Sequence, residues 1–243
     1  MKGVVLAGGL GTRLYPLTFA TSKQLLPVYD KPMIYYPIQT LVKAGIDNIM
    51  VVTGGPNAGD YIQVLRDGKD FGIKHLEYMY QENPVGGVAE GLGLAEEFAA
   101  GDSVAFILCD NTTDADIRPA IEQFTSGATI FLKEVSDPER FGCPVFDLKD
   151  PKKIVRIEEK PAKPASPYAV TGVYLYDAKL FGYIKSLKRS ERGQLEITDV
   201  NNCYIESGTM RWEQLNGFWS DAGTFDSLFE ANAFWAKKAQ AKK

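Results

Sequence analysis

The fold of this chain is decided by a stretch near its start, which reads Gly3-Val4-Val5-Leu6-Ala7-Gly8-Gly9-Leu10-Gly11-Thr12-Arg13. The apolar run over residues 4–7 is typical of a buried strand in a parallel sheet. The three glycines after it lack the Cβ atoms that would keep a phosphate chain away from backbone N–H groups. Thr12 adds a hydroxyl donor, and Arg13 and the later Lys23 add cations that suit phosphate oxygens. The stretch therefore predicts a cradle for a nucleoside triphosphate.

The spacing of the glycines argues against two other phosphate-binding loops, and so against a Rossmann oxidoreductase. The dinucleotide fingerprint G-x-G-x-x-G requires a third glycine where this chain has Leu14, and the P-loop string G-x-x-x-x-G-K-[ST] occurs nowhere in the sequence. A tight strand-to-helix turn without a ligand is an alternative for the glycines alone. The hydroxyl and the two cations that follow them favour phosphate binding.

Composition limits the classes of function. The chain has 243 residues, 45% of them hydrophobic, which suits one large α/β domain with a sub-lobe. Its net charge of -4 argues against a nucleic-acid partner. Three widely spaced cysteines argue against a disulfide framework or a zinc site. Without a leader or an apolar run near 18 residues, we expect a cytoplasmic protein that has no membrane partner.

The first half of the chain alternates strand and helix patterns. Strands are expected at residues 3–7, 48–53, 75–80 and 103–109, and helices at 32–44, 60–66 and 88–99. Pro32 suits an early position of its helix and Gly45 a helix stop. This alternation predicts an α/β fold with a Rossmann-like, mainly parallel mixed sheet flanked by helices.

The second half is richer in strand patterns. Strands are expected at residues 128–135, 144–148, 154–158 and 168–176, and helices at 178–185, 197–207 and 225–238. The proline-rich segment 161–167 must be a loop. Thr198 or Asp199 is a candidate N-cap of its helix, and the lysines at 237–243 are expected at a solvated helix end. We divide the single domain into a core (1–127), a sub-lobe (approximately 128–220) and a C-terminal segment (221–243).

Two aspartates are candidate metal ligands. Asp110 follows an apolar strand, and ligands of such sheets bind beyond the carboxyl ends of the strands, where the glycine loop also lies. Asp221 follows two aromatic residues and precedes a glycine turn. Each has an ordinary structural reading, Asp110 as the start of a turn and Asp221 as a helix cap. Together they offer two hard oxygen ligands, which suit Mg²⁺ bound mostly through substrate phosphates.

The remaining candidates indicate a class of reaction. Glu159 and Lys160 end a strand, and both can face one side only if the strand stops there. Arg192 is a weaker candidate for an anion site, and the single His75 leaves little material for a catalytic triad or a histidine metal site. A phosphate cradle, cations and paired aspartates are what phosphoryl or nucleotidyl transfer needs. An attacking phosphate oxygen is already anionic and requires no general base.

The signature over residues 6–18, with Lys23 and Pro27, resembles that of the sugar-1-phosphate nucleotidyltransferases. Further segments resemble the glucose-1-phosphate thymidylyltransferase branch and cover nearly the whole chain in family order: residues 29–37, 137–142, 158–161, 168–172, 195–199 and 221–224. The resemblance implies the nucleotide-diphospho-sugar transferase fold, with the sub-lobe binding the sugar. It also implies the short form of these enzymes, without extra C-terminal helices or their inter-subunit regulatory site.

The resemblance implies roles for individual residues. Those implied to be catalytic are Arg13, Lys23 and Lys160. Those implied to bind the nucleotide are Leu6, Gly8, Gly11, Thr12, Arg13, Gln81 and Gly87. Those implied to bind the sugar phosphate are Gly142, Glu159, Lys160 and Val170, and those implied to bind Mg²⁺ are Asp110 and Asp221.

The substrates implied are dTTP and glucose 1-phosphate, which give dTDP-glucose and pyrophosphate, and we expect a homo-oligomer. The same chemistry with UTP or another sugar 1-phosphate is an alternative, as is a non-catalytic nucleotide-sugar sensor on this fold. The chain departs from the branch pattern at five positions, which bear on the choice of nucleotide and sugar: Cys109 for glycine, Glu90 for glutamine, Phe141 for tyrosine, Gln194 for glutamate and Phe225 for histidine.

Overall fold

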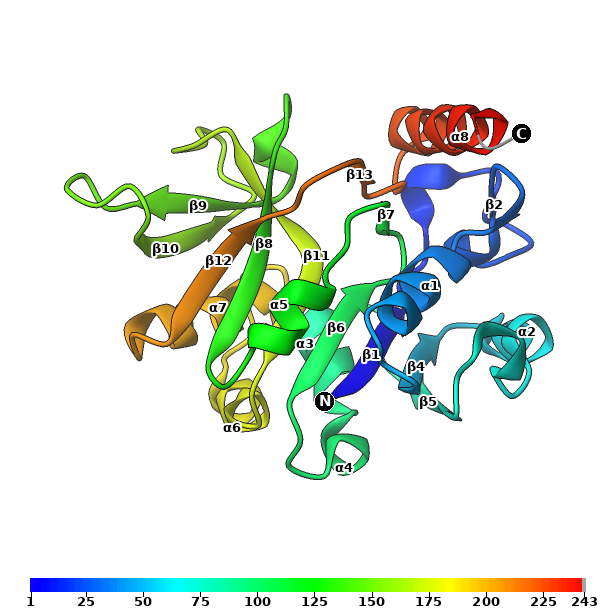
Figure 1. The fold of residues 1–243 in the computed structure, drawn as a ribbon, viewed down its shortest axis with the longest axis horizontal. Coiled ribbons are helices and arrows are strands. Elements are labelled where there is room, and N and C mark those ends of the chain that lie inside the picture. The colour runs from blue at the N-terminus through cyan, green and yellow to red at the C-terminus, as the bar shows by residue number, and fades with distance from the viewer. Residues whose placement is uncertain (242–243) are drawn as a thin grey trace.

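The computed structural model describes residues 1–241, and a mixed nine-stranded sheet forms its centre (Figure 1). The sheet has the order β10-β9-β11-β6-β1-β4-β5, and β8 pairs with both β11 and β12. Its strands are β1 (Lys2–Ala7), β4 (Asn48–Gly54), β5 (His75–Gln81), β6 (Val104–Leu108), β8 (Ala128–Glu134), β9 (Gly142–Phe146), β10 (Ile154–Glu159), β11 (Tyr168–Tyr176) and β12 (Met210–Gln214). Two short ladders lie outside it, β2 (Pro27–Val28) with β3 (Lys31–Pro32) and β7 (Thr112–Thr113) with β13 (Trp219–Ser220).

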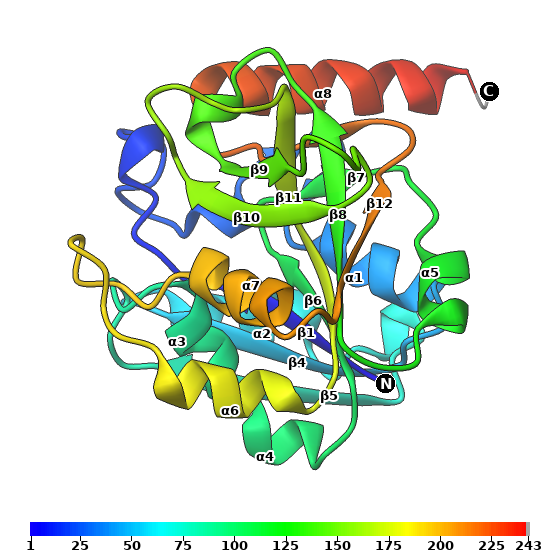
Figure 2. The ribbon, with the colours of Figure 1, turned by 90° about the vertical axis from the view of Figure 1, so that its left-hand side faces the viewer.

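Helices cover both faces of this sheet (Figure 2). The helices are α1 (Tyr35–Lys43), α2 (Ala58–Leu65), α3 (Val88–Gly93), α4 (Glu96–Ala99), α5 (Arg118–Gln123), α6 (Lys179–Ser186), α7 (Ile197–Glu206) and α8 (Phe225–Gln240). One core joins α3, α6 and α7 to the sheet, and a second joins α1, α2 and α5 to the opposite face. Helix α8 lies apart from both, beyond the upper end of β1 and β6 in Figure 1.

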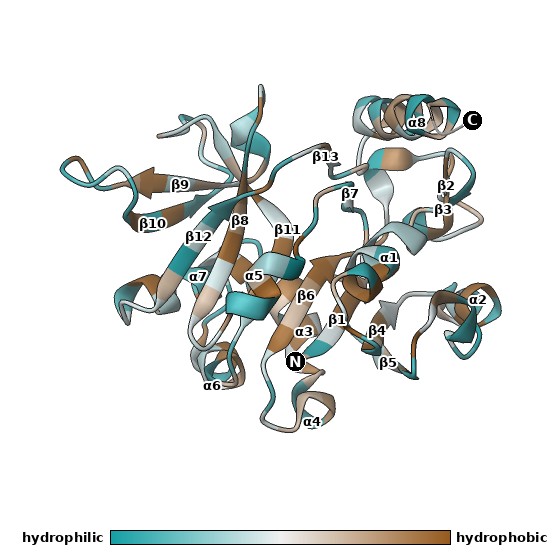
Figure 3. Ribbon diagram, in the orientation of Figure 1, coloured by the Kyte–Doolittle hydropathy of each residue, from teal (hydrophilic) through white to brown (hydrophobic). Residues whose placement is uncertain are grey.

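Strand β1 is buried on both faces, as its apolar run predicted. Val4 and Leu6 pack in the core beneath α3, while Val5 and Ala7 pack in the core beneath α1. The central strands are the most hydrophobic part of the fold in Figure 3. Burying each of the valine and leucine side chains contributes roughly 1.5–3 kcal/mol relative to exposure, so β1 anchors the start of the glycine loop firmly.

The expected α/β fold and the expected strands and helices are confirmed, with boundary corrections. Pro32 does not begin a helix, because the β2–β3 hairpin takes it up and α1 starts only at Tyr35. The helix expected at 88–99 is divided into α3 and α4 at Leu94. There the backbone N–H of Leu94 donates to Gly91, an i→i−3 bond that tightens the turn. Gly45 follows α1 with φ of 90°, as a helix stop requires.

The helix caps also differ from expectation. Helix α7 begins after Glu196, so neither Thr198 nor Asp199 is its N-cap. Asp221 does not cap α8, because Thr224 does so in a reciprocal capping box with Ser227.

The lysine-rich tail is less solvated than predicted. Lys238 Nζ lies 2.5 Å from Asp114 Oδ2, so an ion pair fixes the end of α8 to the segment after β7. The expected tail continues through residues 242 and 243, which lie outside the described residues.

Strand β11 joins the two halves of the molecule, because it pairs antiparallel with β6 of the first half and with β8 and β9 of the second. The expected sub-lobe and the core therefore share one sheet. No helix within residues 1–241 has the length and apolarity that a membrane crossing requires.

Candidate active site

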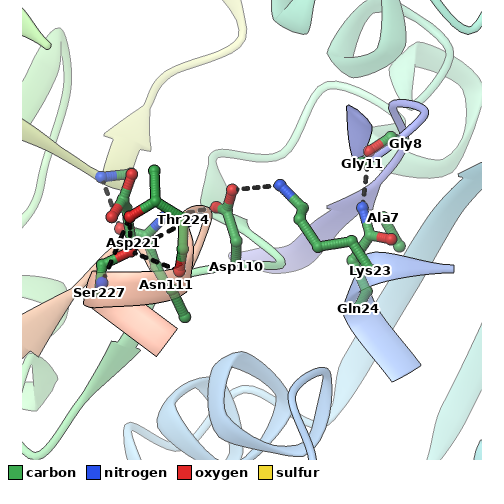
Figure 4. Close-up of polar contacts among 12 residues, drawn as sticks. Ala7, Gly8, Gly11, Lys23, Gln24, Asp110, Asn111, Asp221, Thr224 and Ser227 are labelled. Atoms are coloured by element: carbon green, nitrogen blue, oxygen red, sulfur yellow. Dashed lines mark hydrogen bonds and ion pairs between the residues drawn. The ribbon is translucent and has the colours of Figure 1, made fainter. Parts of the chain in front are cut away.

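The glycine loop and Asp110 leave adjacent parallel strands. Leu6 of β1 lies opposite Leu108 of β6, so the segments that follow emerge side by side. Lys23, from the turn after the glycine loop, reaches across, and its Nζ lies 2.6 Å from Asp110 Oδ2 (Figure 4). Their side chains are only 12% and 17% exposed. The predicted common crevice therefore exists, and an ion pair stands at its centre.

On the glycine-loop side of this pair lies a cavity of about 210 Å³, which we call the Gln81 cavity. It is lined by Leu6, Gly8, Gly9, Lys23, Gln24, Gln81, Pro84, Gly87, Val88, Leu108, Cys109, Asp110 and Gln194. Gln81 is 4% exposed, and a Cβ on Gly8 or Gly91 would lie 3.2 or 2.9 Å from its Oε1. The two glycines therefore make room for the amide, whose donor and acceptor can read one edge of a ligand.

Gln24, which sequence reasoning missed, binds the backbone of the glycine loop through its side chain. Its Nε2 donates to the carbonyl of Gly8 at 2.6 Å, and its Oε1 accepts from the Tyr61 hydroxyl at 2.9 Å. Burial raises the pKa of Tyr61, which keeps the hydroxyl protonated as a donor. The one signal for Gln24 in the sequence is its place directly after Lys23.

On the other side of the ion pair lies the Lys160 cavity, of about 190 Å³. The residues lining it include Arg13, Asp110, Arg140, Gly142, Glu159, Lys160, Val170, Arg192, Gln194 and Asp221. Strand β10 ends at Glu159, and Lys160 has φ of 47°, which meets the condition under which both side chains can face one side. Both line the Lys160 cavity. Glu159 accepts from Thr198 Oγ1 at 2.6 Å and from Arg192 at 3.1 Å. The four predicted sugar-phosphate residues are therefore brought together.

The two predicted metal aspartates both line the Lys160 cavity. Arg140, which sequence reasoning missed, holds Asp221 at 2.9 Å and Asp137 at 2.6 Å. No group of three metal-ligating side chains occurs within residues 1–241. Two carboxylates on one cavity fit Mg²⁺, an ion that keeps most of its shell for phosphate and water oxygens.

Asn111 braces the carboxylate beside it. Its Nδ2 donates to Asp110 Oδ1 at 2.9 Å, and its Oδ1 accepts from the backbone N–H of Gly172 and the indole N–H of Trp219, at 2.9 and 2.6 Å. The Asn111 side chain is buried and has a partner for each of these groups. A segment from β11 and one from β13 are thereby tied to the end of β6, which orients Asp110.

Three residues that the resemblance assigns to the triphosphate, Gly11, Thr12 and Arg13, do not line the Gln81 cavity as Gly8 does. Gly11 and Thr12 line neither cavity, and the Gly11 carbonyl accepts from Thr18 Oγ1 at 2.8 Å. Arg13 lines the Lys160 cavity, and a Cβ on Gly223 would lie 2.9 Å from its Nη2. The structure therefore sets Arg13 beside the turn that carries Asp221. The triphosphate role of these three residues stays a prediction.

The sequence pattern of the family described as Nucleotidyl transferase matches residues 2–238. The chain belongs to this family. The expected resemblance is confirmed as well, since this nucleotidyltransferase is 46% identical over 241 residues to the glucose-1-phosphate thymidylyltransferase of Neisseria meningitidis, covering 96% of this chain and 82% of that one. The namesake enzyme of Mycobacterium tuberculosis is 41% identical over 239 residues, with the same coverages.

Solved structures agree with the fold of this nucleotidyltransferase. A Bacillus anthracis chain provisionally named a glucose-1-phosphate thymidylyltransferase, solved with sucrose, is 48% identical, with a TM-score of 0.90 over 96% of this chain and 94% of that one. A UDP-glucose pyrophosphorylase bound to UDP-glucose has a TM-score of 0.84 at 22% identity, over 98% of each chain. The second likeness concerns the fold alone and confirms the expected fold class.

Proposed function

We propose that the chain transfers a thymidylyl group from dTTP to glucose 1-phosphate and releases dTDP-glucose and pyrophosphate. The observation that carries this proposal is the pair of cavities that meet at Asp110. The Gln81 cavity offers an amide for a base, and the Lys160 cavity offers Lys160 and Glu159 for a sugar phosphate. Two substrates held on opposite sides of one carboxylate meet where a shared metal ion would lie.

The reaction needs little covalent help from the protein. An anionic oxygen of the sugar phosphate forms a bond to the α-phosphorus of dTTP, and the bond from that phosphorus to the bridging α–β oxygen breaks. The electron pair leaves with pyrophosphate, and no proton has to be removed from the nucleophile. Lys160 would hold the attacking phosphate, while Lys23 and Arg13 would stabilise charge on the triphosphate.

Asp110 and Asp221 would hold Mg²⁺ together with the substrate phosphates. The ion would supply charge stabilisation at the α-phosphate and at the leaving pyrophosphate. Each carboxylate is held by a cation in the structure, Asp110 by Lys23 and Asp221 by Arg140. Lys23 and Arg140 therefore keep the two aspartates in place at the edge of the cavity.

The experiment that tests the reaction measures pyrophosphate release with a panel of triphosphates and sugar 1-phosphates. Four triphosphates separate the features of the nucleotide: dTTP against dUTP isolates the 5-methyl group, and dUTP against UTP isolates the 2′-hydroxyl. The fourth, dCTP, presents the opposite donor and acceptor pattern to Gln81. We expect the highest kcat/KM with dTTP and glucose 1-phosphate, and activity only when Mg²⁺ is present.

Two outcomes would overturn parts of the proposal. Good turnover with UTP and none with dTTP would reject the thymidylyl assignment and leave the chemistry. Tight binding of a nucleotide sugar without turnover of any pair would favour a sensor.

A further inference from the structure

An ion pair outside both cavities joins helix α3 to the segment 187–196, which we call the 187–196 loop. Glu90 Oε2 lies 2.5 Å from Arg189 Nη2, and the side chains are 22% and 48% exposed. Arg189 Nη1 also donates to the carbonyl of Gly193 at 2.9 Å, within its own loop, and to that of Gly86 at 3.4 Å. One guanidinium therefore holds the loop, the helix and the turn before the helix.

The loop rests directly on the turn Gly86–Gly87. A Cβ on Gly86 would lie 1.8 Å from Glu90 Oε1, and a Cβ on Gly87 would lie 2.4 Å from the Leu195 carbonyl oxygen. Leu195 N–H donates to Gly86 O at 2.9 Å, and Ala89 N–H donates to Leu195 O at 3.1 Å. Only glycine leaves room at Gly87, where the neighbouring atoms are backbone and φ is 102°, and at Gly86 a side chain would displace the Glu90 carboxylate.

This packing determines where residues of both cavities lie. Gly87 lines the Gln81 cavity, while Gln194 lines both cavities at their junction. Arg192, from the same loop, lines the Lys160 cavity and holds Glu159 at 3.1 Å. A shift of the 187–196 loop would therefore move groups that face each of the two substrates.

We infer that Glu90 and Arg189 are positioning residues, whose ion pair fastens the 187–196 loop to the Gly86–Gly87 turn and preorganises the nucleotide side of the site. The inference rests on the proposed function for its kinetic readout. A partly exposed ion pair adds little to the free energy of unfolding. The Glu90–Arg189 pair restrains a loop, however. When that loop is free, substrate binding must order it, and the entropy lost in doing so weakens the affinity.

The test compares the wild type with Glu90→Ala, Arg189→Met and the double variant. We expect KM for dTTP to rise about three- to tenfold in each, with kcat changed less than about twofold. The double variant should be no worse than the worse single one, because both remove the same link. Glu90→Gln keeps an oxygen that accepts from Arg189 and should retain most of the affinity. Tm should fall by no more than about 2 °C in every variant.

A neighbouring ion pair is the matched control. Glu96 Oε1 and Lys185 Nζ lie 2.6 Å apart, at 45% and 66% exposure, and join α4 to α6 without lining either cavity. Glu96→Ala and Lys185→Met should leave KM unchanged. If the Glu90 and Arg189 variants match these controls in KM, or if they lose affinity only in step with Tm, the inference is wrong.

Direct binding separates this inference from the proposed function. Calorimetry with whichever panel triphosphate binds the wild type best measures Kd without turnover. A wild type that binds but does not turn over would reject the proposed function alone. A Kd unchanged in Glu90→Ala and Arg189→Met would reject the positioning role, whatever the reaction is.

Discussion

Lys23 Nζ lies 2.6 Å from Asp110 Oδ2 at the junction of two cavities, although 87 residues separate them in the chain. The two side chains come from the turn after the glycine loop and from the end of β6, and both are largely buried. Their meeting brings the phosphate-binding cation and the metal-binding carboxylate of the proposed reaction into one place. Removing the charge of either residue should therefore affect the binding or reaction of both substrates.

Removing the charge of Asp110 should abolish catalysis and leave the fold. Asp110→Asn keeps the shape of the side chain but removes the charge that would bind Mg²⁺. We expect kcat/KM to fall about 10³-fold or more, since metal-assisted charge stabilisation contributes several kcal/mol. Circular dichroism should change little, while Tm should fall by a few degrees, because the largely buried Lys23 loses its charged partner. Asp102→Asn, at the exposed amino end of the same strand, is the control that should retain full activity. Full turnover by Asp110→Asn would reject the metal role.

The brace under Asp110 can be tested with an isosteric change. Asn111→Asp replaces the Nδ2 that donates to Asp110 with an oxygen, which puts two carboxylates at 2.9 Å in a buried place. We expect a loss of about 2 kcal/mol in the free energy of unfolding, and a larger fractional loss in kcat than in affinity for dTTP. Urea unfolding and steady-state kinetics measure the two effects. A variant as stable as the wild type would show that Asn111 does not orient Asp110.

The strand-and-glycine start of the chain was predictable because its signals are local. The apolar run, the glycine spacing and the order of strands and helices fixed the sheet and placed the loop and Asp110 at one edge. The alternation of a strand allows Glu159 and Lys160 to face one cavity only where the strand ends, and β10 does end at Glu159.

The missed features depend on contacts between distant segments. Gln24 matters because of Gly8 and Tyr61, and Arg140 because of Asp221, 81 residues later. Neither partnership leaves a pattern along the sequence. Asp221 and Pro32 were assigned helix-start roles by local rules, but a capping box at Thr224 and the β2–β3 hairpin took precedence. Strand β12 was missed although Met210 and Trp212 alternate with two charged residues, because a run of five residues is short and no turn signal pairs it with β8, which lies 82 residues earlier in the chain.

The capping box of α8 gives a prediction about stability. Thr224 Oγ1 accepts from the Ser227 backbone N–H at 3.3 Å, and the Ser227 hydroxyl lies 3.1 Å from the backbone nitrogen of Thr224. Thr224→Ala should lower the free energy of unfolding by about 1 kcal/mol, whereas Thr224→Ser keeps the acceptor and should lower it by half of that or less. Chemical denaturation distinguishes the two. Equal losses in both variants would assign the effect to the methyl group and not to the cap.

Asp199 gives a prediction in which the substitution stabilises the fold, whereas Thr224→Ala destabilises it. Burial, and then the charges of Glu196 and Glu159, raise the pKa of Asp199 above its usual 3.8. An acid whose pKa is higher in the folded state binds more protons when folded, so its contribution to stability declines as pH rises through that window. At pH 7 the ionised group therefore destabilises the fold, and Asp199→Asn should raise Tm by about 1 °C or more.

Two comparisons test the prediction for Asp199: its dependence on pH, and the matching aspartate in the first turn of α8. The advantage of Asp199→Asn should shrink as pH falls and vanish below 3.8, where the wild-type group is protonated in both states. Asp226 lies in the first turn of α8 as Asp199 does in that of α7. There the helix dipole favours a carboxylate by more than the like charge of Glu230, four residues later, disfavours it, so Asp226→Asn should lower Tm slightly at pH 7. Thermal unfolding of both variants from pH 3 to pH 8 measures this. If Asp199→Asn also lowers Tm at pH 7, the dipole outweighs the neighbouring acids, and the carboxylate stabilises α7 despite Glu159 and Glu196.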